Sequence, residues 1–308
     1  MRIVIERHQR NQITLGIASI IAGMFCLTIS DGLAKWLGAT YSPVQLLFLR
    51  GLLAAPILIV LIAILSGRAA LRTEHLGIHL FRGLINVVSA SCFYLGLTML
   101  PLAEATAIAF SAPFFVTIIS VIFLHEKVSL GGWLALLAGF AGVVLIARPN
   151  PQNMQWAVVL PLITALGYAV MMVSARKLNV RESMLTTTLY IALGQAFFAG
   201  LPQAWVWTPV QSGHMAGFLG LAIFSTLGLG LITQAFRVAP ASIVAPFDYT
   251  GLIWATLFGW AIWHEMPSLG FYAGALLIVI SGVYIAVFEA SKKRRKYGGK
   301  KTQQQVGS

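Results

Sequence analysis

Long apolar runs, separated by short polar segments, fill almost the whole chain. Most runs are close to the ~20 residues that an α-helix needs to cross a bilayer. Several of the short connections contain Pro or Gly, which suits hairpins between neighbouring helices. The pattern predicts ten membrane-spanning helices, near residues 13–37, 43–65, 77–99, 104–124, 131–147, 155–175, 184–205, 215–236, 240–263 and 269–288.

The composition agrees with an all-α membrane protein. The chain has 308 residues, of which 58% are hydrophobic and only 10% charged, whereas a soluble domain carries about 25% charged residues. No polar stretch before the C-terminal tail is longer than a loop, so no separate soluble domain is expected. The two cysteines, Cys26 and Cys92, each lie in an apolar run, which excludes a disulfide framework.

Basic residues are distributed unevenly between the two sides of the predicted bundle. If the N-terminus is cytoplasmic, 17 of the 21 Lys and Arg residues fall in cytoplasmic segments. The positive-inside rule therefore predicts that both termini are cytoplasmic. The net charge of +12 includes a basic tail, residues 289–308. A basic segment that follows a last membrane span indicates contact with anionic lipid rather than with nucleic acid.

A seven-residue string occurs twice in the chain. His125–Gly131 (HEKVSLG) returns as His264–Gly270 (HEMPSLG), with five identical positions and an offset of 139, the difference between 264 and 125. At the same offset, Phe110 corresponds to Tyr249, and Ser111 to Thr250. Because five spans separate the two strings, they lie on opposite sides of the membrane. This predicts two inverted five-helix repeats, residues 13–147 and 155–288.

These features resemble the EamA family of the drug/metabolite transporter superfamily. The more specific segments are in the first half: Ser30–Lys35 (SDGLAK), Gln45–Arg50 (QLLFLR), Phe93–Leu97 (FYLGL) and Pro101–Thr106 (PLAEAT). Together they resemble the branch that contains bacterial uptake carriers for riboflavin and S-adenosylmethionine. The resemblance implies ten helices, a central cavity open to one side at a time, transport without ATP hydrolysis by the carrier, and a place in the bacterial inner membrane.

Charged residues within spans are the first candidates for a substrate site, because a charge at the centre of a membrane helix costs at least ~2.5 kcal/mol. Asp248 is the deepest acid, and Pro246 can bend the helix beside it. Glu104 begins the fourth span. Either acid can bind a cationic group or carry a coupling proton. A structural ion pair with an arginine is the alternative for Asp248, and contact with interfacial water is the alternative for Glu104.

Of three other charged residues, Asp31 and Arg82 have clearer structural alternatives, whereas Arg50 is selected as a substrate-binding candidate. Asp31 lies one helical turn before Lys35, so an ordinary i,i+4 pair is expected. Arg82 is expected to extend to the cytoplasmic headgroups. Arg50 lies about eight residues into its span, where it can pair with an acid or bind an anionic group of a substrate.

Aromatic side chains on the helices expected to line the cavity complete the candidate site. Those selected as substrate-binding candidates are Tyr94, Phe114, Tyr168, Tyr249 and Trp254. A planar ring can stack on such residues, although aromatic side chains also pack and face lipid in any membrane protein. The pattern Gly270–Gly274 suits close helix packing, with a homodimer as one use. His125 and His264 are interpreted as loop-end structure, with no metal site and no cofactor expected.

The resulting hypothesis is a secondary transporter of a small polar metabolite that works by alternating access. Riboflavin uptake is the first specific choice, since it combines the branch resemblance with the aromatic residues. Alternatives are an S-adenosylmethionine or aromatic amino-acid transporter, or an exporter of the same family. A membrane-embedded enzyme is disfavoured, because the sequence contains no cluster of catalytic polar groups or phosphate-binding loop.

Overall fold

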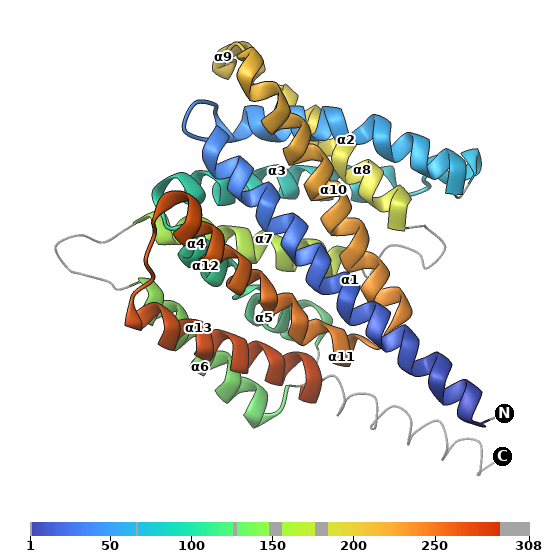
Figure 1. Cartoon of the computed structure of the whole chain (residues 1–308), viewed down its shortest axis with the longest axis vertical. Coiled ribbons are helices and arrows are strands. Elements are labelled where there is room, and N and C mark those ends of the chain that lie inside the picture. The colour runs from blue at the N-terminus through green and yellow to red at the C-terminus, as the bar shows by residue number, and fades with distance from the viewer. Residues whose placement is uncertain (1, 66, 126–127, 148–155, 176–183, 290–308) are drawn as a thin grey trace.

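The computed structural model describes residues 2–65, 67–125, 128–147, 156–175 and 184–289, and these are almost entirely helical (Figure 1). Eight of the described helical segments are long and apolar enough to cross a membrane, and Leu185–Gly200 forms a shorter apolar helix. The first three predicted spans correspond to α1 (Arg2–Leu37), α2 (Pro43–Leu65) and α3 (Leu76–Met99). The predicted all-α membrane fold is confirmed.

The remaining predicted spans are also helical. The fifth is α6 (Leu130–Ala147), the sixth α7 (Val159–Ala175) after a short η2 (Trp156–Val158), and the eighth α10 (Met215–Val238). The seventh consists of α8 (Met184–Gly200) and the short α9 (Gln203–Val206), and the tenth is α13 (Leu269–Tyr284), which continues into η5 (Ile285–Glu289). Short 3-10 turns, η1 (Arg68–Leu71) and η3 (Ser212–His214), lie in connections.

Two predicted spans are broken in their interior. The fourth divides into α4 (Leu102–Ala109) and α5 (Ala112–Leu124), and the ninth into α11 (Ala241–Val244), η4 (Ala245–Tyr249) and α12 (Thr250–Trp263). A proline lies in the first turn after each break, Pro113 in α5 and Pro246 in η4. Proline removes a backbone donor from the helix, so the bend expected at Pro246 is present as a 3-10 segment.

The two halves of the chain interlock as inverted repeats. Equivalent helices pack against each other across the molecule, α2 against α8 and α6 against α13. Figure 1 shows that α2 and α8 run in opposite directions, as do α6 and α13. The beginning of α1 and the end of η5 lie at the same end of the bundle (Figure 1). The side of the membrane that this end faces stays a prediction, and the basic tail after Glu289 lies outside the described residues.

Glycines allow the repeats to approach closely. A methyl group built on Gly142 of α6 would lie 2.6 Å from the carbonyl oxygen of Gly274 on α13. Likewise, a methyl group on Gly83 of α3 would lie 2.9 Å from the Cα atom of Gly194 on α8. Close backbone approach is the usual role of small residues between membrane helices. Gly274, which the sequence suggested for helix packing, therefore packs against a helix of its own chain.

The repeated string forms the same turn in both halves. His125 (φ 51°) and His264 (φ 56°) adopt the left-handed conformation at the ends of α5 and α12, and they are the non-glycine residues with positive φ in the described part of the chain. The backbone N–H groups of Gly132 and Phe271 each donate to a serine hydroxyl, Ser129 Oγ and Ser268 Oγ, at 3.2 Å. The string thus ends one helix and caps the next, while Glu126 and Lys127 lie outside the described residues.

Arg82 differs from the sequence-based expectation. Its side chain is only 7% exposed, so it lies inside the bundle instead of extending to the headgroups. Arg82 lies in the second turn of α3, and α3 packs against both α7 and α8. A side chain near a helix end can snorkel only when the helix has a free face there, and neighbouring helices cover this face of α3.

Candidate functional site

The two broken helices meet at the centre of the molecule. The rings of Phe110, at the end of α4, and Tyr249, at the end of η4, have their centroids 5.2 Å apart. These residues are equivalent under the repeat offset of 139, so they lie close to the pseudo-symmetry axis that relates the halves. Discontinuous helices at a repeat interface are where secondary transporters place their substrate sites.

Asp248 lies in η4, directly beside this crossing. Its carboxylate is partly exposed, and no hydrogen bond or ion pair joins it to the residues that the structure describes. Tyr168 of α7 is close enough to Asp248 for an electrostatic interaction, and 51% of the Tyr168 side chain is exposed. The acid and the tyrosine are therefore not fully enclosed by protein, and no cation among the described residues pairs with Asp248.

The other aromatic candidates near the crossing differ in their surroundings. Tyr249 packs with its hydroxyl against Gly282 of α13. Trp254 of α12 makes an edge-to-face contact with Phe25 of α1, at 5.0 Å between ring centroids. The indole Nε1 of Trp254 is buried and has no hydrogen-bond partner among the described residues. Phe25, which is 37% exposed, was not selected from the sequence, because nothing in its own run distinguishes it.

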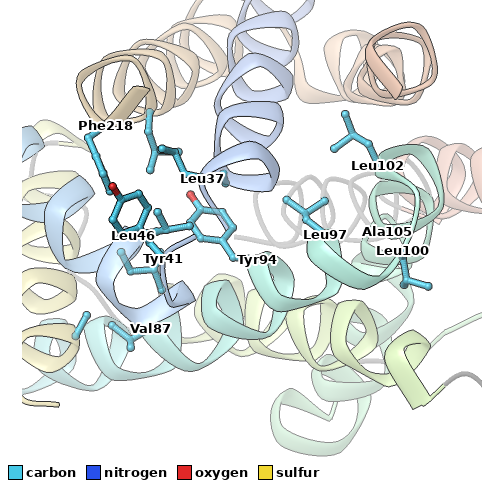
Figure 2. Packing of buried hydrophobic residues seen from close by; sticks show 14 of the residues in the cluster. Leu37, Tyr41, Leu46, Val87, Tyr94, Leu97, Leu100, Leu102, Ala105 and Phe218 are labelled. Carbon is cyan, nitrogen blue, oxygen red and sulfur yellow. The ribbon is translucent and has the colours of Figure 1, made fainter. Parts of the chain in front are cut away.

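A second polar group joins α1, α2 and α3. The Nη1 atom of Arg50 donates a hydrogen bond to the Tyr94 hydroxyl at 2.6 Å. Tyr94 is 2% exposed and belongs to a core cluster with Tyr41, Leu97 and their neighbours (Figure 2). Asp31 interacts electrostatically with both Arg50 and Tyr94, and Ser30 also lies beside the Tyr94 hydroxyl. The core thus fixes Tyr94, and Tyr94 orients Arg50.

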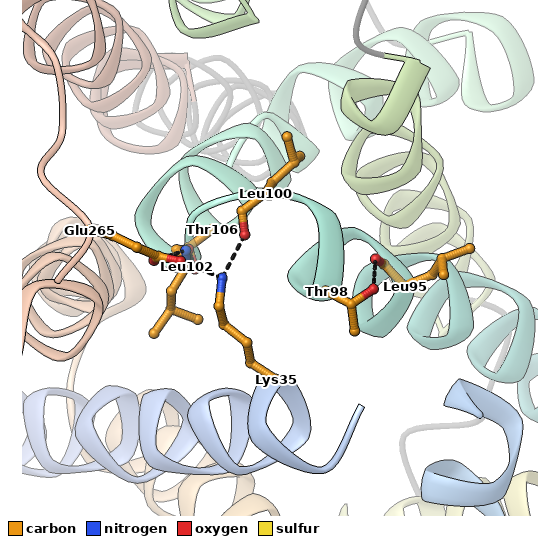
Figure 3. A network of polar contacts seen from close by, with 7 residues as sticks. All are labelled: Lys35, Leu95, Thr98, Leu100, Leu102, Thr106 and Glu265. Carbon is orange, nitrogen blue, oxygen red and sulfur yellow. Dashed lines mark hydrogen bonds and ion pairs between the residues drawn. The ribbon is translucent and has the colours of Figure 1, made fainter. Parts of the chain in front are cut away.

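The expected pair between Asp31 and Lys35 does not form. Lys35 Nζ instead lies 2.6 Å from Glu265 Oε1 and donates to the carbonyl oxygen of Leu100 at 2.7 Å (Figure 3). The other carboxylate oxygen of Glu265 accepts from the backbone N–H of Leu102, at 2.8 Å. Glu265 therefore caps α4 of the first repeat from the second repeat. This acid was missed as a contact residue, although its repetition in both His-Glu strings was a usable signal.

Two candidates lie in less open surroundings. Phe114 is fully buried in a core cluster, where its ring packs against Gly139 and Phe140 of α6. Glu104 lies partly buried in the first turn of α4 and already has an interaction partner. The structure thus brings Asp248, Tyr168 and Tyr249 to the central crossing and Arg50 and Tyr94 to the second group, while Trp254 packs against Phe25 of α1. Among the described residues, no group of three or more His, Cys, Asp or Glu could hold a metal ion.

A family model agrees with the repeats seen in the geometry. The model described as "EamA-like transporter family" matches twice, at residues 14–148 and 155–288. The chain belongs to the EamA-like transporter family. As a member of it, the protein is a secondary transporter of small metabolites and not an enzyme.

Individual relatives carry different solutes. An "S-adenosylmethionine uptake transporter" of Rickettsia conorii is 24% identical over 92% of this chain and 96% of its own length. A "Riboflavin transporter" of Vibrio cholerae is 31% identical over 74% of this chain and 78% of its own. A pseudopaline exporter of Pseudomonas aeruginosa is 26% identical over 88% of this chain and 95% of its own. The EamA-like family therefore does not by itself fix the substrate or the direction of transport.

A solved structure supports the fold of this family member. A crystal structure with 18% sequence identity superposes with a TM-score of 0.62, covering 89% of this chain and 98% of that one. The likeness concerns the fold alone.

Proposed function

We propose that this EamA-like transporter takes up a small metabolite that combines a planar ring with a cationic group, and that S-adenosylmethionine is its first candidate substrate. The observation that carries the proposal is Asp248, a partly exposed carboxylate without a cationic partner among the described residues. An unpaired charge inside a membrane protein is expensive, and a substrate cation compensates for it. S-adenosylmethionine has a sulfonium cation and an adenine ring.

Aromatic residues support the planar part of the solute. Tyr168 and Tyr249 lie beside Asp248, and Trp254, further along α12, forms an aromatic pair with Phe25 of α1. The unpartnered Nε1 of Trp254 provides a hydrogen-bond donor for a ring nitrogen or carbonyl group of a substrate. The ring of a substrate can stack on these side chains, and a cationic group of the substrate is attracted to the faces of their aromatic rings.

Riboflavin is the second candidate, favoured by the 31% identity to the Vibrio cholerae riboflavin transporter and by the same aromatic residues. A neutral flavin does not compensate a carboxylate charge, so Asp248 would accept hydrogen bonds from the flavin imide or ribityl groups. We therefore rank riboflavin as a candidate substrate below a cationic solute, which would neutralise the Asp248 carboxylate. Transport takes place, in this proposal, across a bacterial inner membrane with both termini in the cytoplasm.

Coupling and direction are part of the proposal. Asp248 is the first candidate for a coupling proton, because a carboxyl group with no ion-pair partner among the described residues can take up and release a proton during transport. Glu104 is a weaker candidate, since it already has an interaction partner. A transporter in which Asp248 carries the proton requires an inward proton gradient for accumulation, whereas facilitated diffusion only equilibrates the solute.

The test is uptake of radiolabelled S-adenosylmethionine, riboflavin and tryptophan by bacteria that express the chain and lack their own carriers for these solutes. Saturable uptake of S-adenosylmethionine, competed by excess unlabelled compound, is the expected result. Saturable uptake of riboflavin alone would replace the first candidate by the second. Efflux from preloaded cells without uptake would show that the protein is an exporter. Repeating the assay with a protonophore separates proton coupling from facilitated diffusion.

A further inference from the structure

A separated acid and cation lie on two helices that are consecutive in the chain, at the end of the site nearer the α1 C-terminus. Asp31 of α1 and Arg50 of α2, both partly exposed, interact electrostatically but do not come within the 4.0 Å of a direct ion pair. Lys35, the cation nearest to Asp31 along α1, is held instead by Glu265 and the Leu100 carbonyl group. Asp31 therefore keeps its carboxylate available to face Arg50.

The cation is oriented and has hydrogen-bonding capacity left. A guanidinium carries five N–H donors, and the structure gives Arg50 one hydrogen-bond partner in the described part of the chain, the hydroxyl of buried Tyr94. Its remaining N–H groups suit a carboxylate, which a guanidinium binds through two parallel hydrogen bonds. Because Tyr94 accepts from Arg50, the Tyr94 O–H is itself free to donate toward Ser30 or Asp31, both of which lie beside it.

From this arrangement we infer that Asp31 and Arg50 form a clamp for the α-amino-acid head group of the substrate. Arg50 binds the α-carboxylate, and Asp31 binds the α-ammonium group. In an α-amino acid, the carboxylate and the ammonium group are bonded to the same carbon atom. Such a zwitterion fits between a cation and an acid that interact electrostatically but are too far apart for a direct ion pair. This rests on the proposed function and narrows it to amino acids and their derivatives, a class to which S-adenosylmethionine belongs and riboflavin does not.

Asp31 lies close to the face of α1 that packs against α12, the helix directly after the segment that contains Asp248. The side chain of Met24 reaches α12 at Gly251, three residues after Asp248: a methyl group built on Gly251 would lie 2.5 Å from Met24 Cε. Asp31 is seven residues after Met24, which returns it to nearly the same face of the helix after a rise of ~10 Å. An elongated solute can therefore place its head group at the clamp and the rest of its structure near Asp248 and the aromatic residues.

The test measures binding to the purified full-length protein through ligand-induced thermal stabilisation, which does not depend on transport. The probes are matched sets: S-adenosylmethionine with its decarboxylated form, and tryptophan with tryptamine and indole-3-propionate. Each charge-assisted contact contributes enough for about a ten- to hundredfold preference. We expect the intact amino acid of a set to bind more tightly by that factor than the amine or acid that lacks one charge.

Variants assign the two ends of the head group. Arg50→Gln is expected to abolish the preference for the carboxylate while keeping that for the ammonium group, and Asp31→Asn the reverse. Arg50→Lys and Tyr94→Phe, which keep the cation, are expected to lose only part of the carboxylate preference. These two variants keep the test decisive if the neutral variants fail to fold. Arg237→Gln, which removes an exposed cation at the end of α10, is the control and is expected to bind as the wild type.

Three results would overturn the clamp: amines binding the wild type as tightly as amino acids, an unchanged carboxylate preference in folded Arg50→Gln or Arg50→Lys, or stabilisation by riboflavin but by no amino acid. Failure of the proposed substrate can be distinguished from failure of the clamp. If tryptophan binding shows the signature of the clamp while cells take up no S-adenosylmethionine, the clamp stands and the substrate proposal falls. If S-adenosylmethionine is taken up but its decarboxylated form binds equally well, only the clamp falls.

Discussion

At the scale of single residues, the protein separates its interior charges into those with partners and those without. Lys35 and Glu265 neutralise each other and are 10% and 21% exposed as side chains. Arg50 is held by Tyr94, while Asp248 has no hydrogen-bond or ion-pair partner in the described part of the chain. Removing one charge of the Lys35–Glu265 pair should damage the fold, whereas removing the charge of Asp248 should damage transport.

Asp248→Asn tests this distinction at the central crossing. The substitution keeps the shape and removes the charge, so we expect normal folding with at least about tenfold slower uptake of a cationic substrate, the effect of losing one charge-assisted contact. Initial uptake rates, corrected for the amount of protein in the membrane, measure it. Tyr168→Phe, which keeps the ring beside Asp248, is expected to have a smaller effect. An uptake rate equal to that of the wild type in a folded Asp248→Asn protein would show that transport does not need this acid.

At the scale of elements, the connections between helices carry interactions between the repeats. The α12–α13 turn supplies Glu265, which caps α4, and the same carboxylate holds Lys35 at the end of α1. Three helix ends from both halves of the chain therefore share one carboxylate (Figure 3). Changing this one carboxylate is therefore expected to affect α1, α4 and α12 together.

Glu265→Gln is expected to destabilise the protein by about 1–3 kcal/mol, less than the loss of a fully buried charge partner, because water partly screens this pair. The reason is that Lys35 loses its counter-charge. Thermal unfolding in detergent measures the change. Glu74→Gln, at an exposed position before α3, is the matched control and should melt as the wild type. The double variant Lys35→Met/Glu265→Gln should recover part of the loss, and a fully additive loss would argue against the pairing.

The left-handed residue that ends α12 gives a second element-scale prediction. His264 has φ 56°, a conformation that glycine adopts freely and β-branched residues adopt poorly. His264→Gly is therefore expected to be neutral or stabilising by up to about 1 kcal/mol, and His264→Val destabilising by about 1–2 kcal/mol. Thermal unfolding compares the pair. An equal effect of both variants would mean that the imidazole, not the backbone conformation, matters at this position.

At the scale of the whole molecule, the two repeats interlock through close backbone contacts. The α6–α13 interface is formed by equivalent helices, one from each repeat, which meet at Gly142 and Gly274. Around the central crossing, the broken fourth and ninth spans contribute one aromatic ring each, Phe110 and Tyr249. The inverted symmetry therefore determines both how the halves pack and where the candidate site lies.

Gly142→Ala and Gly230→Ala form a matched test of this interlocking. Both glycines lie inside helices, but a methyl group on Gly142 would meet the Gly274 carbonyl oxygen at 2.6 Å, whereas one on Gly230 meets nothing within 4 Å. Gly142→Ala is expected to lower the melting temperature, by an amount equivalent to about 1–3 kcal/mol. Gly230→Ala should be neutral or slightly stabilising, since alanine favours the helix. Equal melting temperatures would show that the helices separate to accept the methyl group.

The sequence alone determined the ten helical segments, their division into two repeats and the interruption near Pro246. These features depend on local hydropathy, on proline chemistry and on an exact repeat offset, all of which are properties of the linear sequence. The turn formed by each His-Glu string was also predictable, because a helix end and an N-cap are local structures.

Only the tertiary structure decided which charged and aromatic residues meet. Lys35 is four residues from Asp31 but pairs with Glu265, more than two hundred residues away, because the α12–α13 turn lies over the end of α1. Phe114 and Arg82 are buried in the structure, because neighbouring helices cover the faces of α5 and α3 on which they lie. Nearly every residue of a membrane helix is apolar or small, so hydropathy does not distinguish a face that packs on protein from one that faces lipid or a cavity. That distinction depends on which helices come together.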